Sequence, residues 1–157
     1  MIVLYPGSFN PVTYGHIDIA TRAAKIFNGL LIAVLNNPNK KPFFSIEKRI
    51  DFLEKTFCEY KNIRIESFSG SLADYVKQKN ADIIIRGLRT PSDFESEAPY
   101  ATANRIFTLG IETIFLPADP KYSHISSSLA REALTLGLDT KSIVPHYVKE
   151  EQNGSIT

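Results

Sequence analysis

Five short apolar segments alternate with segments of helical periodicity, and this alternation constrains the fold of the 157-residue chain more than any other feature. The expected strands are 2–5, 30–35, 63–68, 81–85 and 112–116, with 63–68 nearer the sheet edge because its apolar residues alternate. The expected helices begin near Gly15, after Ser45, at Leu72, at Asp93 and near Leu129, with a last short helix at 145–151. Strands that alternate with helices predict an α/β fold, a Rossmann-like parallel five-stranded sheet with helices on both faces.

The length of the chain predicts a single domain over 1–157, with a frayed tail from about residue 151. A formal net charge of +1 offers no overall attraction to nucleic acid, and no apolar run is long enough to cross a membrane. Cys58, the one cysteine, excludes an internal disulfide, and beside Phe57 we expect it to be buried filler. We therefore expect a cytoplasmic protein with neither a nucleic-acid nor a membrane partner.

The first strand is followed by a loop that is rich in Gly, Pro, Ser and Asn. Pro6 and Gly7 are expected to stop the strand, and the next helix places His16 in its first turn. The first turn of a helix presents unpaired N–H groups and favours anions, so a histidine there can meet a bound phosphate. On this stretch alone, an ordinary strand-loop-helix connection with a surface histidine explains the sequence equally well.

Residue types that bind phosphate follow four of the expected strands. They are Ser8 and His16, Lys40 and Lys41, Arg86 and Arg89, and Ser126, Ser127 and Ser128. Taken singly, the lysines read as a solvated loop tip, the arginines as surface charges, and Ser127 or Ser128 as a helix N-cap. Because the carboxyl ends of parallel strands meet at one sheet edge, the four groups together predict a phosphate-binding site.

Several common catalytic patterns are missing from the sequence. It contains neither a P-loop nor a Gly-x-Gly-x-x-Gly motif, and no Ser/His/Asp set, Cys/His pair or metal-ligand spacing stands out. The chain thus offers hydrogen-bond donors and positive charge without an obvious base or nucleophile. Phosphoryl and nucleotidyl transfer can proceed on such groups, since positioning and charge stabilisation supply most of the catalysis.

Two motifs, Tyr5 to His16 (YPGSFNPVTYGH) and Ile125 to Arg131 (ISSSLAR), resemble the nucleotidyltransferase superfamily. Within it, the segments NKKP from Asn39, IRGLR from Ile85 and DFESE from Asp93 resemble bacterial phosphopantetheine adenylyltransferases. The resemblance covers Leu4 to about Val148 with the same order and spacing of segments. Two positions depart from the family pattern: Ser8 stands where Thr is usual, and Asn10 where Asp is commoner.

The resemblance implies adenylyl transfer from ATP to 4′-phosphopantetheine, giving dephospho-CoA and pyrophosphate, with Mg²⁺ accompanying ATP and no protein side chain as metal ligand. It implies a homohexamer. It implies that Ser8, His16, Lys40 and Arg89 are catalytic, and that Ser8, Lys40, Leu72 and Arg86 bind the acceptor. The implied ATP-binding residues are Ser8, Phe9, His16, Gly87, Leu88, Arg89, Glu97, Tyr122, Ser123, His124, Ile125, Ser126, Ser127 and Ser128.

Two alternatives stay open at this point. One is an adenylyl- or cytidylyltransferase with another phosphorylated acceptor, such as nicotinamide mononucleotide or glycerol phosphate. The other is a catalytically silent nucleotide-binding module that kept the fold. The acceptor pocket decides the first, and the complete set of cationic and serine residues argues against the second.

Overall fold

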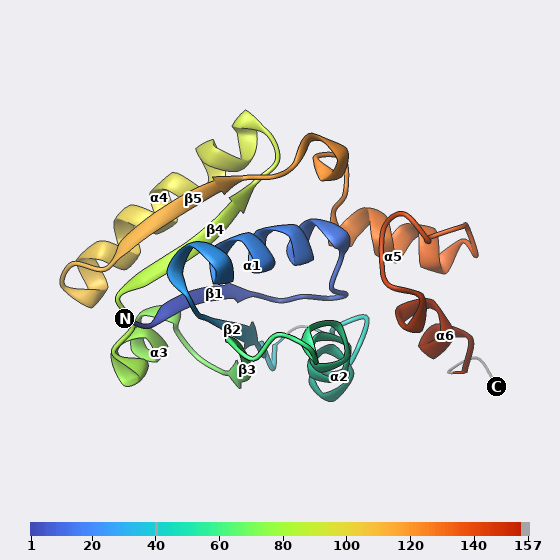
Figure 1. Cartoon of the computed structure of the whole chain (residues 1–157), viewed down its shortest axis with the longest axis horizontal. Coiled ribbons are helices and arrows are strands. Elements are labelled where there is room, and N and C mark those ends of the chain that lie inside the picture. Colours follow the sequence, from blue (N-terminus) through green and yellow to red (C-terminus); the bar gives the residue numbers. More distant parts are fainter. Residues whose placement is uncertain (40, 155–157) are drawn as a thin grey trace.

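The five strands form one parallel sheet in the order β3-β2-β1-β4-β5 (Figure 1). A computed structural model describes residues 1–39 and 41–154 of the chain. The strands are β1 (Val3–Gly7), β2 (Leu30–Leu35), β3 (Ile63–Phe68), β4 (Ile83–Leu88) and β5 (Glu112–Pro117). The helices are α1 (Tyr14–Phe27), α2 (Ile46–Phe57), α3 (Leu72–Lys79), α4 (Pro91–Thr108), the 3₁₀ turn η1 (Pro120–Tyr122), α5 (Ser127–Thr135) and α6 (His146–Gly154). The predicted fold class is confirmed.

The strand order reverses between β1 and β4, which are neighbours at the centre of the sheet. β1 pairs with β2 on one side and with β4 on the other, while β3 lies at an edge as its alternating pattern predicts. In open α/β sheets, ligands bind outside the carboxyl ends of the strands at such a reversal. The fold therefore indicates a candidate ligand site at the segments that follow β1 and β4.

β1 does not stop before Pro6, as the sequence suggested, but continues through Pro6 and Gly7 beside β2. Its pairing with β4 ends earlier, at Leu4 opposite Ile84, and the carbonyl of Pro6 accepts a hydrogen bond from the Arg86 side chain instead. The N–H and C=O of one strand residue point to the same side. The N–H that proline lacks would therefore face a gap in the ladder, so Pro6 costs β1 no bond.

Helices cover both faces of the sheet. In Figure 1, α1 crosses in front of the strands, and α4 lies behind β4 and β5. One buried cluster joins α1 and α2 to β1 and β2, and a second joins the opposite face of these strands to Tyr75 and Val76 of α3. Helix α4 differs, since none of its residues is buried.

Several boundaries differ from the sequence prediction. Helix α4 begins at Pro91 behind an N-cap, Thr90, and runs through Pro99, and α6 extends to Gly154 rather than ending at residue 151. The rest of the expected frayed tail, 155–157, lies outside the described residues.

Cys58 is exposed, so the expectation of a buried filler is wrong. It follows α2 as its C-cap, about 100° around the helix from Phe57, which takes the buried position. In the part of the chain that the structure describes, no helix combines the length and the apolar character needed to span a bilayer.

Candidate active site

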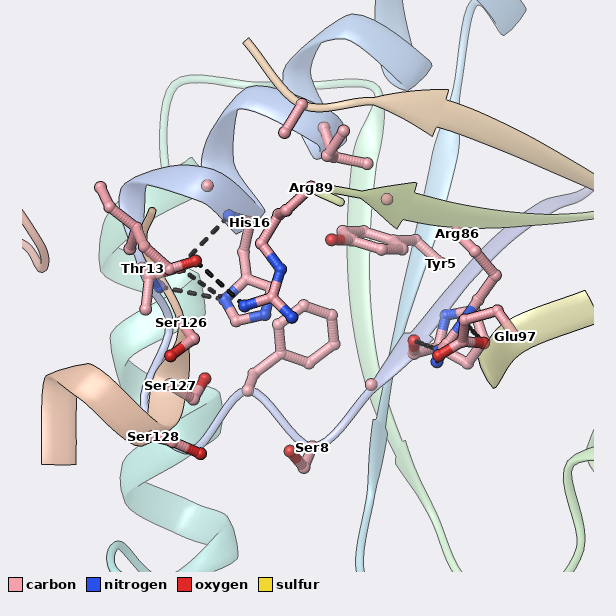
Figure 2. A pocket seen from close by; sticks show the side chains of 18 of the residues that line it. Tyr5, Ser8, Thr13, His16, Arg86, Arg89, Glu97, Ser126, Ser127 and Ser128 are labelled. Carbon is pink, nitrogen blue, oxygen red and sulfur yellow. Dashed lines mark hydrogen bonds and ion pairs between the residues drawn. The ribbon is translucent and has the colours of Figure 1, made fainter. Parts of the chain in front are cut away.

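A cavity of about 370 Å³, here called the main cavity, opens at the carboxyl ends of β1 and β4, beside the first turns of α1 and α5. Figure 2 shows His16 and the three serines on one side of it and Arg86 with Glu97 on the other. Eleven residues proposed from the sequence line it: Ser8, Phe9, His16, Arg86, Gly87, Arg89, Glu97, Ile125, Ser126, Ser127 and Ser128. Three of the four predicted groups therefore meet at one sheet edge, whereas Lys41 lines a neighbouring cavity and Lys40 lies outside the described residues.

His16 is held by the N-terminal cap of its own helix. Thr13 is the N-cap of α1, and its backbone N–H donates to Nδ1 of His16 at 3.1 Å. The Thr13 hydroxyl accepts from the His16 N–H at 3.4 Å, so the two residues form a reciprocal capping box. An atom that accepts from a backbone N–H carries no proton, so the proton of neutral His16 lies on Nε2.

The surroundings keep the imidazole of His16 uncharged. Burial lowers the pKa of His16 to about 4, and the positive charges of Arg89 and Arg86 add to the effect. The ring of Phe9 packs edge-on against the imidazole with centroids 5.0 Å apart. At neutral pH His16 therefore offers an Nε2–H donor at the cavity wall without adding a charge.

Arg86 is fixed from three directions at the end of β4. Its Nε and Nη2 donate to the two carboxylate oxygens of Glu97 at 2.8 and 2.5 Å, and its Nη1 donates to the carbonyl of Pro6 at 2.8 Å. A bidentate arginine–carboxylate pair fixes the plane of the guanidinium. Glu97 lies on α4, so this helix fixes the orientation of the Arg86 guanidinium at the cavity wall.

Arg89 is held by the same helix. Its Nε and Nη2 donate to the two carboxylate oxygens of Asp93, each at 3.1 Å, while Nη1 donates to the carbonyl of Ile125 at 3.2 Å. This arginine charge lowers the pKa of Asp93 against the opposing effect of burial. Arg89 thus links the start of α4 to the segment that carries the serines.

The three serines make different contacts at the start of α5. Ser126 is the N-cap and accepts from the N–H of Leu129, so the expected cap at Ser127 or Ser128 is wrong by one or two residues. Ser127 donates to the carbonyl of Pro11 at 2.9 Å, and Ser128 accepts from Arg131 at 3.0 Å. The first N–H groups of α5 form an anion-binding helix terminus at this wall.

Gly87 is required where α1 packs against β4. A Cβ at this position would lie 2.8 Å from Cγ1 of Ile19, a distance at which one of the two elements must shift. The absence of a side chain lets α1 approach β4 closely. This contact helps to set the distance between His16, on α1, and the two arginines near Gly87, Arg86 and Arg89.

Not every proposed residue reaches the main cavity. Leu88, Tyr122, Ser123 and His124 are not among its lining residues, and Leu72 lines a smaller neighbouring cavity of about 240 Å³ that shares Arg86 and Glu97. Lys40 lies outside the described residues. The structure thus separates a compact wall of donors from the η1 segment that the resemblance grouped with it.

Residues that were not proposed from the sequence also contribute to the site, and Thr13, Asp93 and Arg131 are three of them. Thr13 orients His16, Asp93 orients Arg89, and Arg131 lines the main cavity. The sequence separation between each of these residues and its contact could have indicated the contact. Thr13 stands three residues before His16, Asp93 four after Arg89 and Arg131 three after Ser128, the separations at which side chains meet on a helix or at its cap.

Asn10, one of the two departures from the family pattern, makes a side-chain contact with the β2–α2 loop. The side-chain oxygen of Asn10 accepts from the backbone N–H of Phe44 at 2.9 Å, as a carboxylate could. The substitution therefore changes charge, and Ser8 retains a hydroxyl at an exposed position on the cavity wall.

Comparison with known proteins shows the family and the fold. The model of the cytidylyltransferase-like family matches residues 4–133. A solved structure described as a putative nicotinate-nucleotide adenylyltransferase from Vibrio parahaemolyticus superposes with a TM-score of 0.69 at 18% identity, covering 95% of this chain and 89% of that one. At this identity the likeness shows the fold alone. Fold, site and family model define a nucleotidyltransferase.

Similarity to curated relatives identifies the family within the nucleotidyltransferases. The chain is 49% identical to a phosphopantetheine adenylyltransferase of Carboxydothermus hydrogenoformans, over 94% of this chain and 91% of the relative. It is 48% identical to that of Dictyoglomus thermophilum, over 94% and 90%. The relative from Caldanaerobacter subterraneus is 46% identical over 95% and 93%. The chain belongs to the phosphopantetheine adenylyltransferase family.

Proposed function

We propose that this protein transfers the adenylyl group of ATP to 4′-phosphopantetheine, releasing pyrophosphate and forming dephospho-CoA in coenzyme A biosynthesis. Relatives with this name cover nearly the whole chain. The observation that carries the proposal is the main cavity, where a neutral histidine donor, two oriented arginines and a helix N-terminus converge. These groups suit two substrates that both bring phosphates.

The reaction needs no general base from the protein. A phosphate oxygen of the acceptor attacks the α-phosphorus of ATP, and the bond from that phosphorus to the oxygen bridging to the β-phosphate breaks. The attacking oxygen is already ionised near neutral pH. The protein must bring two anions together in line and stabilise the charge that develops at the α-phosphorus.

His16 suits the α-phosphate. Its Nε2–H is a donor whose direction is fixed by the contact between Thr13 and Nδ1, so it need not reorganise as the pentacoordinate phosphorus forms. Ser8 offers a hydroxyl on the same wall. We assign Arg89 and the α5 terminus with its serines to the β- and γ-phosphates, and Lys40 to the reacting phosphates.

Arg86 suits the acceptor. It lines both the main cavity and the smaller cavity that Leu72, Tyr100 and Asn104 also line. A phosphate held by Arg86 would face the α-phosphorus, while the rest of the acceptor extends into the smaller cavity. This two-cavity arrangement favours an acceptor with a long arm attached to its phosphate.

We propose that Mg²⁺ arrives bound to the phosphates of ATP. Among residues 1–39 and 41–154, no three His, Cys, Asp or Glu side chains are grouped as a metal site. The donors of the main cavity are N–H groups and hydroxyls, which suit phosphate oxygens. When bound, Mg²⁺ neutralises part of the phosphate charge.

We further propose that the chain assembles as a homohexamer and acts in the cytoplasm. The support for assembly is α4, whose Phe94, Tyr100, Ile106 and Phe107 are exposed large apolar side chains. Contact with other copies of the chain would remove these exposed apolar side chains from water. The free thiol of Cys58 suits a reducing compartment.

One assay tests the reaction. Pyrophosphate release from ATP is measured with 4′-phosphopantetheine, with nicotinamide mononucleotide, with glycerol phosphate and without any acceptor. We expect turnover with the first alone. Equal or faster turnover with another acceptor would overturn the assignment of 4′-phosphopantetheine, although the protein would still be a nucleotidyltransferase. ATP binding without any turnover would favour a silent nucleotide-binding module.

A further inference from the structure

A second cavity, about 710 Å³ in volume and here called the loop cavity, lies on the other side of the β1–α1 loop. Its lining includes Ser8, Asn10, Lys41, Arg49 and Arg131. Ser8 and Arg131 also line the main cavity, so the two cavities adjoin. The reaction described above assigns no role to the loop cavity.

Arg49 is a buried cation in this wall. The residue is 3% exposed, and its Nη1 donates to the carbonyls of Ser8 at 2.8 Å and Leu35 at 3.0 Å. No carboxylate among the described residues forms an ion pair with it, although burial disfavours its charge and lowers its pKa. Arginine nevertheless stays protonated in proteins, so its positive charge is stabilised by backbone carbonyls and by the charge of Glu47, which forms no ion pair with it.

One end of this guanidinium remains available. Nη2 of Arg49 makes no hydrogen bond to any residue from 1–39 or 41–154. Thr113 Oγ1 is the one fully enclosed side-chain polar atom without a partner in that part of the chain, so Nη2 of Arg49 is not enclosed. It is therefore a donor that a ligand in the loop cavity can reach.

Asn10 supplies a second available donor. Its side-chain oxygen accepts from the N–H of Phe44, which fixes the orientation of the amide and leaves Nδ2 as the outer atom. The backbone carbonyl of Asn10 accepts from Arg131 at 2.7 Å, so this arginine is held beside it. An amide here adds a donor where a carboxylate would have added negative charge.

The charges of the lining residues have one sign. Arg49, Arg131 and Lys41 are cationic, and no Asp or Glu occurs among the described residues of the lining. Two of the three are arginines whose positions are fixed by backbone carbonyls. Fixed cations in a hollow attract a polyanion more strongly than scattered surface lysines do, because no side-chain ordering is needed on binding.

We propose that the loop cavity binds inorganic pyrophosphate, receiving it from the main cavity as the product departs. Arg131 contacts Ser128 at the wall of the main cavity and also lines the loop cavity, so a polyanion can exchange partners along it. The source of the pyrophosphate rests on the proposed function. The binding itself rests on Arg49, Asn10 and Arg131.

Calorimetric titration of the full chain with inorganic pyrophosphate, without nucleotide, tests the site. Asn10→Asp keeps the acceptor for Phe44 and places a negative charge between the cations, so the Kd should rise about tenfold. Asn39→Asp adds the same charge to the β2–α2 loop outside the described lining and should leave the Kd unchanged. Arg89→Gln alters the group assigned to the β- and γ-phosphates in the main cavity and does not line the loop cavity, so it should change the Kd less than about twofold.

The opposite pattern overturns the site. A Kd that responds to Arg89→Gln and ignores Asn10→Asp would locate pyrophosphate in the main cavity. If Asn10→Asp fails to fold, as judged by circular dichroism, Lys41→Ala at the exposed rim should still weaken binding. An enzyme that binds pyrophosphate in the expected pattern but releases none from ATP overturns the proposed function and supports the site.

Discussion

The backbone N–H of Thr13 points at Nδ1 of His16, 3.1 Å away, so one hydrogen bond both caps a helix and selects the tautomer of the histidine. Capping boxes commonly use Glu or Gln at the third helical position. Here His16 takes that position and keeps its second nitrogen for the cavity. The same contact that stabilises the end of α1 therefore prepares a donor for phosphate.

We expect His16 to remain neutral far below the usual range of histidine. Burial lowers its pKa to about 4, whereas the unfolded chain titrates near 6.5. NMR titration of the imidazole resonances, with His16 identified by its absence in His16→Gln, should show no charging between pH 7 and 5. An inflection near pH 6.5 would contradict the proposed environment.

The same pKa difference makes a prediction for stability. As pH falls from 6.5 to about 4, the unfolded state binds a proton at this position and the folded state does not, so the free energy of unfolding falls. Above pH 6.5 neither state binds a proton at this position, so His16 makes no contribution to the pH dependence of the free energy of unfolding. Urea unfolding of the wild type and His16→Gln should therefore diverge through this window, with the wild type losing more stability.

Replacement of His16 should damage catalysis. His16→Ala removes one preorganised donor at the α-phosphate, which costs about 3–4 kcal/mol of transition-state stabilisation. The measurement is kcat/KM for both substrates beside the melting temperature. Wild-type turnover would reduce His16 to a capping residue, and so would a variant that simply unfolds.

Arg86→Lys tests the orientation of the acceptor. Lysine keeps the charge but cannot form the fork with Glu97 while also donating to Pro6 in the arginine geometry. We expect KM for 4′-phosphopantetheine to rise about tenfold while KM for ATP stays near wild type. Arg105→Lys, the same change in an exposed pair with Glu112, is the matched control and should behave as wild type.

Thr113 provides a stability test in the smaller cavity wall. Its Oγ1 is enclosed and has no hydrogen-bond partner among the described residues. Thr113→Val keeps the shape and removes the unpaired hydroxyl, so the free energy of unfolding should rise by about 1 kcal/mol. Thr108→Val is the contrast, because its hydroxyl donates to Asn104 and accepts from Ile111, and it should destabilise the chain. Equal effects in both variants would refute the reasoning.

Much of the fold followed from local pattern. The alternation of apolar runs and helical faces was sufficient for the five parallel strands, and the carboxyl-edge rule was sufficient to group His16, Arg86 and Arg89. The errors arose where tertiary contacts decide. Pro6 stays in its strand because β4 has already stopped pairing, and Cys58 is exposed because Phe57 takes the buried position.

The orientation of the site residues was harder to predict. Local patterns predicted the positively charged residues, and Glu97 was proposed as an ATP-binding residue. The pairing of Glu97 with Arg86 and of Asp93 with Arg89 was not predicted. Arg49 was missed altogether, because a buried arginine that binds only carbonyls leaves no charge pattern in the sequence. Such partners depend on which loops meet, and this is decided by the whole fold.

Helix α4 connects two properties of the molecule. It supplies Glu97 to Arg86 and Asp93 to Arg89, yet it buries none of its own residues. A helix without buried residues therefore orients both arginines. If copies of the chain cover its exposed apolar side chains, assembly also stiffens the two guanidinium forks. Specific activity should then fall on dilution below the concentration at which the copies separate.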